Sequence, residues 1–294
     1  MDRFNEALAA GRLLADGGMG TQLQALGLAG GEAPERWNLS HPLEVQSVHE
    51  AYLAAGCRLI TANTFGASPL KYGPGWEQAL DAGLNIARRA ITQSGPGALL
   101  ALDIGSCGHL LRPLGDTDFD EAVENARQVA LHGADADVFL VETMTDLAEV
   151  KATVLGLRQG ADKPIVVSMT FDEHGRLLTG ASIEGACAML EGLRVSAIGL
   201  NCGHEPAALM DNLRRMLAAT RLPVLFQPNA SLPRVENGET IFDVTPELFA
   251  QDMAQAARLG AIILGGCCGT TPAHLRALRK ALESEPIVHR TLPE

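Results

Sequence analysis

Three of the six cysteines in this 294-residue sequence have a spacing that suits a metal ion. Cys267 and Cys268 are adjacent, and Cys202 closes an earlier apolar run. Neighbouring side chains on a regular strand point to opposite faces, but Gly265 and Gly266 let the backbone turn so that both sulfurs face one ion. Structural zinc is normally closed by four protein ligands, whereas catalytic zinc keeps a fourth position open. We therefore predict one catalytic Zn²⁺ per chain on these three cysteines.

The other cysteines are interpreted differently. Free cysteine is often a small buried hydrophobic residue, and we expect this of Cys57, Cys107 and Cys187. In a chain of this length without a signal peptide, we expect reduced thiols or ligands rather than a disulfide framework. A redox pair at positions 267–268 is the weaker alternative, because a disulfide between neighbouring residues is strained.

The ligand set indicates a reaction class. Three thiolates leave zinc with a net negative charge and weak Lewis acidity, so the site is poorly suited to activating water for hydrolysis. It can bind a substrate thiol, release its proton and leave the sulfur electron-rich enough to attack carbon. We therefore predict alkyl transfer to sulfur, with no catalytic side chain beyond the zinc-activated thiolate of the substrate.

The elements that must position these cysteines form an alternating pattern. Eight short apolar runs, rich in leucine and β-branched residues, are typical of strands buried on both faces. They lie at 13–15, 59–62, 99–102, 138–141, 165–169, 197–200, 224–226 and 262–264. Helical patterns lie between them at 49–55, 76–94, 119–132, 206–219, 247–259 and 272–282. Several begin at proline or end at glycine.

This alternation predicts an α/β fold, a single (β/α)₈ TIM barrel domain over residues 1–294. A doubly wound open sheet is the alternative, although no glycine-rich dinucleotide fingerprint follows any strand. We expect a polar loop at 231–244, after the seventh strand.

Polar or thiol side chains follow strand after strand, and the carboxyl ends of barrel strands converge on one mouth. The segments are 16–20, 63–64, 103, 142–143, 170, 201–202, 228–229 and 265–268. Asp16 and Glu142 are candidates to bind the ammonium of an amino acid, or else simple strand caps or ion-pair partners. The backbone N–H groups of the turn at 17–20 are candidates for its carboxylate, as in a nest.

Composition excludes several partners. The formal net charge is -12 and the pI is about 5.1, with no basic cluster to offset it, so we predict no nucleic-acid partner. The N-terminus lacks the features of a secretory signal. No apolar run approaches the roughly 20 residues that span a bilayer. We expect a cytoplasmic enzyme without a membrane partner.

The motifs together carry a family resemblance. They are LADGGMGT at 14–21, NTFGA at 63–67, ET at 142–143, NC at 201–202, PNA at 228–230 and GGCCGTTP at 265–272. This set resembles the homocysteine S-methyltransferase family over residues 13–282. The resemblance implies methylation of L-homocysteine to L-methionine, with zinc on Cys202, Cys267 and Cys268. It further implies Asp16 and Glu142 at the substrate ammonium, Gly17 and Gly18 at its carboxylate, and Asn229 lining the site.

Within that family, RWNLSHP at 36–42 and MTFD at 169–172 are similar to the homocysteine-binding module of cobalamin-dependent methionine synthase. That enzyme carries further folate, cobalamin and activation modules. The nearest match to its corrinoid pattern Asp-x-His-x-x-Gly is at Asp172 to His174, with Leu177 where glycine is needed. We therefore expect no corrinoid bound by this chain itself, and a separate corrinoid protein as methyl donor.

Other functions stay open at this level. S-methylmethionine or S-adenosylmethionine would want an aromatic or acidic cage; only Trp37 and Tyr72 are candidate cage members, and ordinary loop packing is their simpler interpretation. Betaine as donor is less favoured because additional aromatic-rich segments are lacking. A non-catalytic zinc- or thiol-binding barrel is the alternative from another class, and a zinc hydrolase is disfavoured by the all-thiolate ligands.

Overall fold

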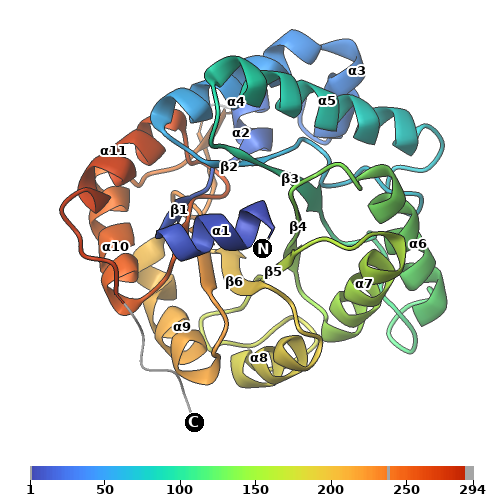
Figure 1. Cartoon of the computed structure of the whole chain (residues 1–294). Coiled ribbons are helices and arrows are strands. Elements are labelled where there is room, and N and C mark those ends of the chain that lie inside the picture. Colours follow the sequence, from blue (N-terminus) through green and yellow to red (C-terminus); the bar gives the residue numbers. More distant parts are fainter. Residues whose placement is uncertain (1, 237–238, 289–294) are drawn as a thin grey trace.

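The computed structural model describes residues 2–236 and 239–288, so the ends of the predicted 1–294 domain lie outside the described residues. Eight parallel strands form the predicted (β/α)₈ TIM barrel (Figure 1). They are β1 (Leu13–Leu14), β2 (Leu59–Thr61), β3 (Leu99–Ile104), β4 (Val138–Met144), β5 (Ile165–Met169), β6 (Ala197–Cys202), β7 (Val224–Pro228) and β10 (Ile263–Leu264). Their order is β1-β10-β7-β6-β5-β4-β3-β2, and a bridge between Ala15 and Leu59 closes the ring.

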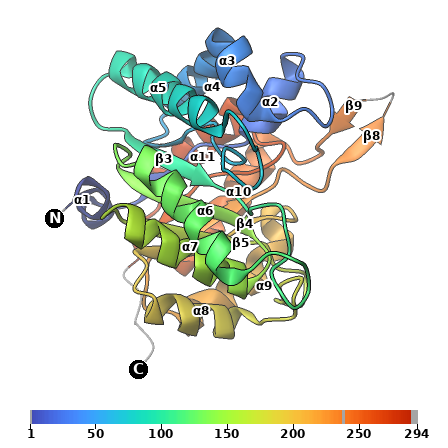
Figure 2. The ribbon, with the colours of Figure 1, turned by 90° about the vertical axis from the view of Figure 1, so that its right-hand side faces the viewer.

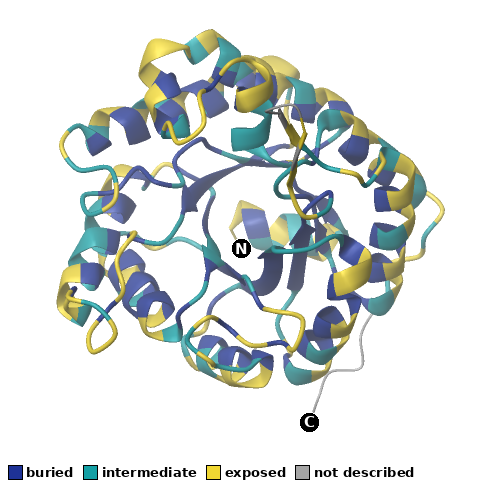
Figure 3. Ribbon diagram, turned by 180° about the vertical axis from the view of Figure 1, so that it is seen from behind, coloured by how far each residue is buried: buried dark blue, intermediate teal, exposed yellow. Residues whose placement is uncertain are grey.

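Eight helices surround the strands, with buried faces inward and exposed faces outward (Figure 3). They are α4 (Pro42–Ala55), α5 (Trp76–Ser94), α6 (Phe119–His132), α7 (Leu147–Gly160), α8 (Ile183–Gly192), α9 (Pro206–Ala219), α10 (Pro246–Leu259) and α11 (Pro272–Leu282). The six predicted helices are confirmed, although α4 begins earlier, at Pro42. Helices α7 and α8 had no specific prediction; Gly156 and Gly185 inside them weaken the helical signal.

The interior of the barrel is a separate apolar cluster. The inward residues of successive strands alternate with outward ones, as the strand period of two requires. The cluster comprises Leu13, Ala15, Leu59, Leu99, Ala101, Val138, Leu140, Val166, Ala197, Leu225 and Ile263, together with Phe4. Phe4 comes from α1 (Arg3–Ala10), which crosses the amino-terminal end of the barrel (Figure 1). Chemistry is therefore left to the opposite end.

The carboxyl end of the barrel carries extra structure. The β1–α4 connection holds α2 (Met19–Ala25), the 3₁₀ turn η1 (Pro34–Arg36) and α3 (Trp37–Ser40). The predicted loop at 231–244 is corrected: it contains an antiparallel hairpin, β8 (Arg234–Glu236) and β9 (Glu239–Ile241), on the side away from α1 (Figure 2). The polar sequence of this hairpin gave no strand signal. Ion pairs hold the hairpin, because Arg234 binds Asp243 at 2.9 Å and also Glu236. Residues 237–238 lie outside the described part.

Among the helices within residues 2–236 and 239–288, none has both the length and the apolar character needed to cross a bilayer.

The variant Phe4→Ala tests whether α1 stabilises the barrel by packing against its amino-terminal end. Because Phe4 is fully buried among the inward residues, we expect the free energy of unfolding to fall by about 3 kcal/mol, measured by urea denaturation. The control Leu178→Ala, at a side chain 78% exposed, should change it by less than about 0.5 kcal/mol. Equal effects of the two variants would contradict this role for α1.

Candidate functional site

Three cysteines converge at the mouth of the barrel. The sulfurs of Cys202, Cys267 and Cys268 all lie within 4.8 Å of one another. Each side chain is half-buried, and all three line one cavity of about 340 Å³. The structure therefore brings together the three residues that the sequence selected, whereas Cys57, Cys107 and Cys187 are buried elsewhere.

Hydrogen bonds of the backbone hold the two adjacent cysteines in place. Strand β10 ends at Leu264, after which the Cys267 N–H donates to the Pro228 carbonyl at 2.8 Å. The Cys268 carbonyl accepts from the Ala230 N–H at 2.9 Å, and the Thr270 hydroxyl donates to the Cys267 carbonyl at 2.6 Å. The chain after β10 is thus bound to the end of β7, which leads both sulfurs toward β6.

Cys202 reaches the cluster through an unusual backbone conformation. Its φ is 61°, in the left-handed region that a side chain rarely adopts. Gly203 follows with φ of 74°, and its carbonyl accepts from the Asn229 side chain at 3.0 Å. Such strain persists only where the surroundings enforce it, and it is common at functional sites.

The sulfurs are close enough to share protons. Hydrogen bonds from the Cys267 and Cys268 thiols lower the pKa of Cys202 to about 3. The same contacts raise the pKa of Cys267 well above its usual range and that of Cys268 to about 12. The three sulfurs thus compete for protons, which a bound cation would replace. Three sulfur donors beside an open cavity suit a thiophilic ion such as zinc, so the residues fit the predicted metal.

The turn after β1 packs directly against the cysteine loop. A Cβ on Gly18 would lie 2.7 Å from the Cys267 carbonyl oxygen, and one on Gly17 would lie 2.5 Å from the Thr270 hydroxyl. The Gly18 N–H already donates to Thr270 Oγ1 at 3.1 Å. Of the two predicted carboxylate donors, Gly17 is therefore the one whose N–H has no partner within the described residues.

The two predicted acids both line the cavity. Buried Asp16 accepts from the Thr61 N–H and hydroxyl, each at 2.8 Å, and burial raises its pKa to about 7. Burial and the charges of Asp16 and Cys202 raise the pKa of Glu142 to about 8. Within the described residues no lysine, arginine or histidine lines this cavity, so a cationic ligand group is the partner that these carboxyls lack.

Further cavity-lining residues had no predicted role. They are chiefly Glu35, Phe65, Asp103 and Gln227. Glu35 is held by the Gly66 N–H at 2.5 Å, and its position in a short 3₁₀ turn gave no sequence signal. Asp103 stood out only as a polar residue at a strand end.

A family model described as homocysteine S-methyltransferase matches residues 13–282. The chain belongs to this family. It is 34% identical to the methionine synthases of Mycobacterium tuberculosis and Mycobacterium leprae, over 92% and 94% of this chain. The chain spans only about a quarter of the length of these curated relatives, 24% and 25%.

Solved structures of the homocysteine methyltransferase MmuM from Escherichia coli share the fold. The metallated form matches with a TM-score of 0.77 at 23% identity, covering 93% of this chain and 98% of that one. The oxidized form matches with a TM-score of 0.75 at 23% identity, covering 92% and 95%. At this level of identity the likeness concerns the fold, which is the same (β/α)₈ barrel in both proteins.

Two groups of predicted residues lie behind or beside the cavity. Buried Asn229 donates a hydrogen bond to the Cys202 sulfur that helps to lower the pKa of that thiol, so it supports a predicted ligand rather than forming the cavity wall. Trp37 is buried and stacks on His41 at 4.2 Å, and Arg36 lies over the Tyr72 ring at 5.7 Å. Neither aromatic lines the cavity; Trp37 belongs to the hydrophobic core and Tyr72 packs against it.

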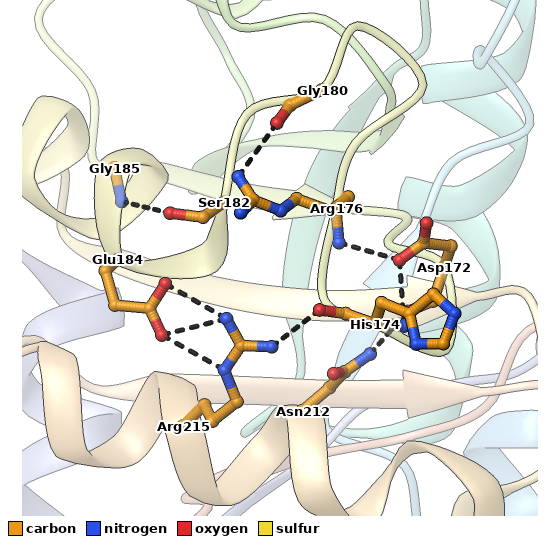
Figure 4. A network of polar contacts seen from close by, with 9 residues as sticks. All are labelled: Asp172, His174, Arg176, Gly180, Ser182, Glu184, Gly185, Asn212 and Arg215. Carbon is orange, nitrogen blue, oxygen red and sulfur yellow. Dashed lines mark hydrogen bonds and ion pairs between the residues drawn. The ribbon is translucent and has the colours of Figure 1, made fainter.

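The segment nearest to a corrinoid-binding pattern is a hydrogen-bonded turn between β5 and α8 (Figure 4). Asp172 accepts from the N–H groups of His174 and Arg176 at 2.9 and 2.8 Å. Arg215 of α9 binds the His174 carbonyl and Glu184 of α8. The His174 side chain is 79% exposed and lies in the connection between β5 and α8.

The contact between the two loops predicts a steric effect on metal binding. In Gly18→Ala the new methyl group would force the Cys267 peptide to move, and we expect zinc affinity to fall at least about tenfold, measured by competition with a chromogenic chelator. The matched control is Gly20→Ala, where a Cβ meets only Pro34 at 3.8 Å. Wild-type zinc affinity in Gly18→Ala would refute the contact.

Asp16 should make the metal-free protein less stable as pH rises. Its folded pKa of about 7 exceeds the usual aspartate value of 3.8, so the folded state binds more protons between those values and the free energy of unfolding falls with rising pH. Asp16→Asn can keep both Thr61 contacts and should be more stable than wild type by about 4 kcal/mol at pH 8, with the difference vanishing near pH 4. Thermal unfolding across this range measures it.

The control is Asp211→Asn, at a carboxylate whose side chain is 90% exposed. It should show no comparable change between pH 4 and 8. A stability difference for Asp16→Asn that does not grow with pH would show that Asp16 is not a buried carboxylate of raised pKa.

Proposed function

We propose that this chain is a single homocysteine-binding barrel domain that acts as a zinc-dependent homocysteine S-methyltransferase and forms L-methionine. The observation that carries the proposal is the meeting of three sulfurs, all within 4.8 Å, with two buried carboxyls in one cavity. Cys202, Cys267 and Cys268 would hold one zinc ion. The cavity has the two kinds of group that an amino acid with a thiol side chain needs.

The chain's own residues would orient the amino-acid end of homocysteine. Asp16 and Glu142 line a cavity that has no cationic side chain among the described residues, and they would bind the ammonium. The turn at Gly17 and Gly18 would receive the carboxylate, with Gly17 offering its N–H directly and Gly18 shaping the backbone. Asn229 would act from behind by holding the Cys202 sulfur.

Zinc bound here would lower the pKa of the homocysteine thiol and so raise its nucleophilicity at neutral pH. The strand-end side chains would keep the reacting sulfur at the centre of the mouth. The apolar cluster beneath the cavity, which includes Ala101, Leu140 and Leu225, keeps water from entering through the barrel.

For the methyl donor we favour a methyl-corrinoid carried by a separate protein. Methionine synthases are the relatives at 34% identity, and about three quarters of their length lies outside the matched region. Phe65 is the only aromatic residue that the structure describes in the cavity lining, which gives little of the aromatic cage that a sulfonium donor would use.

One observation supports a second candidate donor. The cavity is lined by Asp16, Glu35, Asp103 and Glu142 without a compensating cation among the described residues. An acidic cavity favours a positively charged donor such as S-methylmethionine or S-adenosylmethionine. A donor comparison therefore belongs in the first experiment.

The proposal is tested by measuring zinc content and homocysteine-dependent methionine formation in one preparation. Methyl donors to compare are a methylated corrinoid protein, methylcobalamin, S-methylmethionine, S-adenosylmethionine and betaine. We expect one zinc per chain and turnover with the corrinoid donors. Cys267→Ala and Cys268→Ala should lose zinc and turnover together, whereas Cys187→Ala, at a cysteine buried outside the cluster, should keep both.

Tight zinc binding by both variants would contradict the ligand assignment. Stoichiometric zinc without turnover from any donor would favour the non-catalytic zinc- or thiol-binding barrel instead.

A further inference from the structure

Asp103 is a buried carboxyl for which the proposed chemistry has no use. Asp103 lines the cavity and is only 7% exposed. Its Oδ1 is buried and has no hydrogen-bond partner within the described residues. A buried carboxylate oxygen without a partner costs free energy, so a ligand that supplies the missing donor would relieve that cost.

The position of Asp103 on β3 directs it toward the barrel axis. Leu99 and Ala101 belong to the inward cluster, and the strand period of two places Asp103 on the same inward face. Asp103 pairs in register with Leu140, which is also inward, so Glu142 is the next inward position above it on β4. Asp103 therefore lies on the floor of the cavity, one layer below Glu142.

The backbone of Asp103 is fixed from the neighbouring strand end. The Thr64 hydroxyl donates to the Asp103 carbonyl at 2.9 Å and accepts from the Asp103 N–H at 3.1 Å. The residue is thus anchored on both sides by one side chain. These bonds fix the backbone position from which the Asp103 carboxyl projects.

The charges around Asp103 are almost all negative. Burial and the charges of Glu142, Glu35 and Asp16 raise its pKa well above the usual range, and Lys71 opposes them. Lys71 lies with its Nζ 4.2 Å from the centre of the Phe65 ring and does not line the cavity. The carboxyls also do not form a metal site: in the described residues the three cysteines are the one group spaced to hold an ion.

A second floor residue has the same deficiency. Gln227 is 3% exposed, lines the cavity, and carries a buried Oε1 without a hydrogen-bond partner in the described part of the chain. It follows the inward Leu225 on β7 by two positions, so it occupies the inward face as Asp103 does. Two buried acceptors without a partner among the described residues, Asp103 Oδ1 and Gln227 Oε1, point to a ligand group that donates hydrogen bonds.

We propose that Asp103, assisted by Gln227, binds the ammonium group of the amino-acid substrate from below and makes the site selective for thiols that carry a free ammonium. An ammonium has three N–H donors and no acceptor, which matches the acceptors without a partner that Asp103 and Gln227 add to the cavity lined by Asp16 and Glu142. The inference rests on the proposed function, since it takes homocysteine as the ligand. It adds a third carboxyl to the substrate site and a basis for rejecting des-amino thiols.

The test compares two thiols by calorimetric titration of the zinc-loaded protein. L-homocysteine carries the ammonium, and 4-sulfanylbutanoic acid is the same molecule without it. In Asp103→Asn we expect homocysteine to bind about tenfold more weakly, the loss of one charged hydrogen bond, and the des-amino thiol to bind as in wild type. Gln227→Leu should weaken homocysteine about threefold with the same selectivity.

Two controls accompany these variants. Asp211→Asn removes an exposed carboxylate and should change neither affinity, and zinc content should stay at the wild-type value in every variant. Unchanged homocysteine affinity in Asp103→Asn would overturn the inference. So would an equal loss for both thiols, since that is the signature of a structural role.

The failure of the proposed function gives a different result. In that case wild-type protein would bind neither thiol, or would bind both equally. The inference would then fall with it, whereas a wild type that prefers homocysteine and a variant that keeps this preference would overturn Asp103 alone.

Discussion

The site depends on the contact between the turn after β1 and the loop after β10, where the first strand of the barrel lies beside the last. Three hydrogen bonds join them: the Ala15 N–H to the Leu264 carbonyl, the Gly266 N–H to the Asp16 carbonyl, and the Gly18 N–H to the Thr270 hydroxyl. Tyr52 of α4 adds a bond from its hydroxyl to the Thr270 carbonyl at 3.0 Å. This seam places the Asp16 carboxyl and two sulfurs in one cavity, although they lie at opposite ends of the chain.

The glycines of the seam follow from this contact. Neither Gly17 nor Gly18 needs a left-handed conformation, because neither has a positive φ. They are required because backbone and hydroxyl atoms of the opposing loop occupy the space of a Cβ. The glycine-rich motif is therefore primarily a packing device, and the carboxylate contact proposed for it would be secondary.

Groups in the cavity that suit a ligand also lower the stability of the empty protein. Carboxyls such as Asp16 and Glu142 are held where burial raises their pKa values, and Asp103 carries an oxygen without a partner. Each arrangement destabilises the empty protein, since buried charge without a partner is costly. The same arrangement would favour a cationic group that enters the cavity, as preorganised sites do.

The sequence by itself determined the barrel, the three cysteines and the acids Asp16 and Glu142. Runs of buried strand residues and the polar residues that follow them have a regular local order, and local order is what a sequence displays. Only the tertiary structure decided the rest. Glu35 reaches the cavity from a 3₁₀ turn, and Asn229 lies behind a sulfur. Asp103 and Gln227 lie on the floor of the cavity, because strand register sets the height of each inward residue. These contacts join segments that are far apart in the chain, so no local sequence pattern could reveal them.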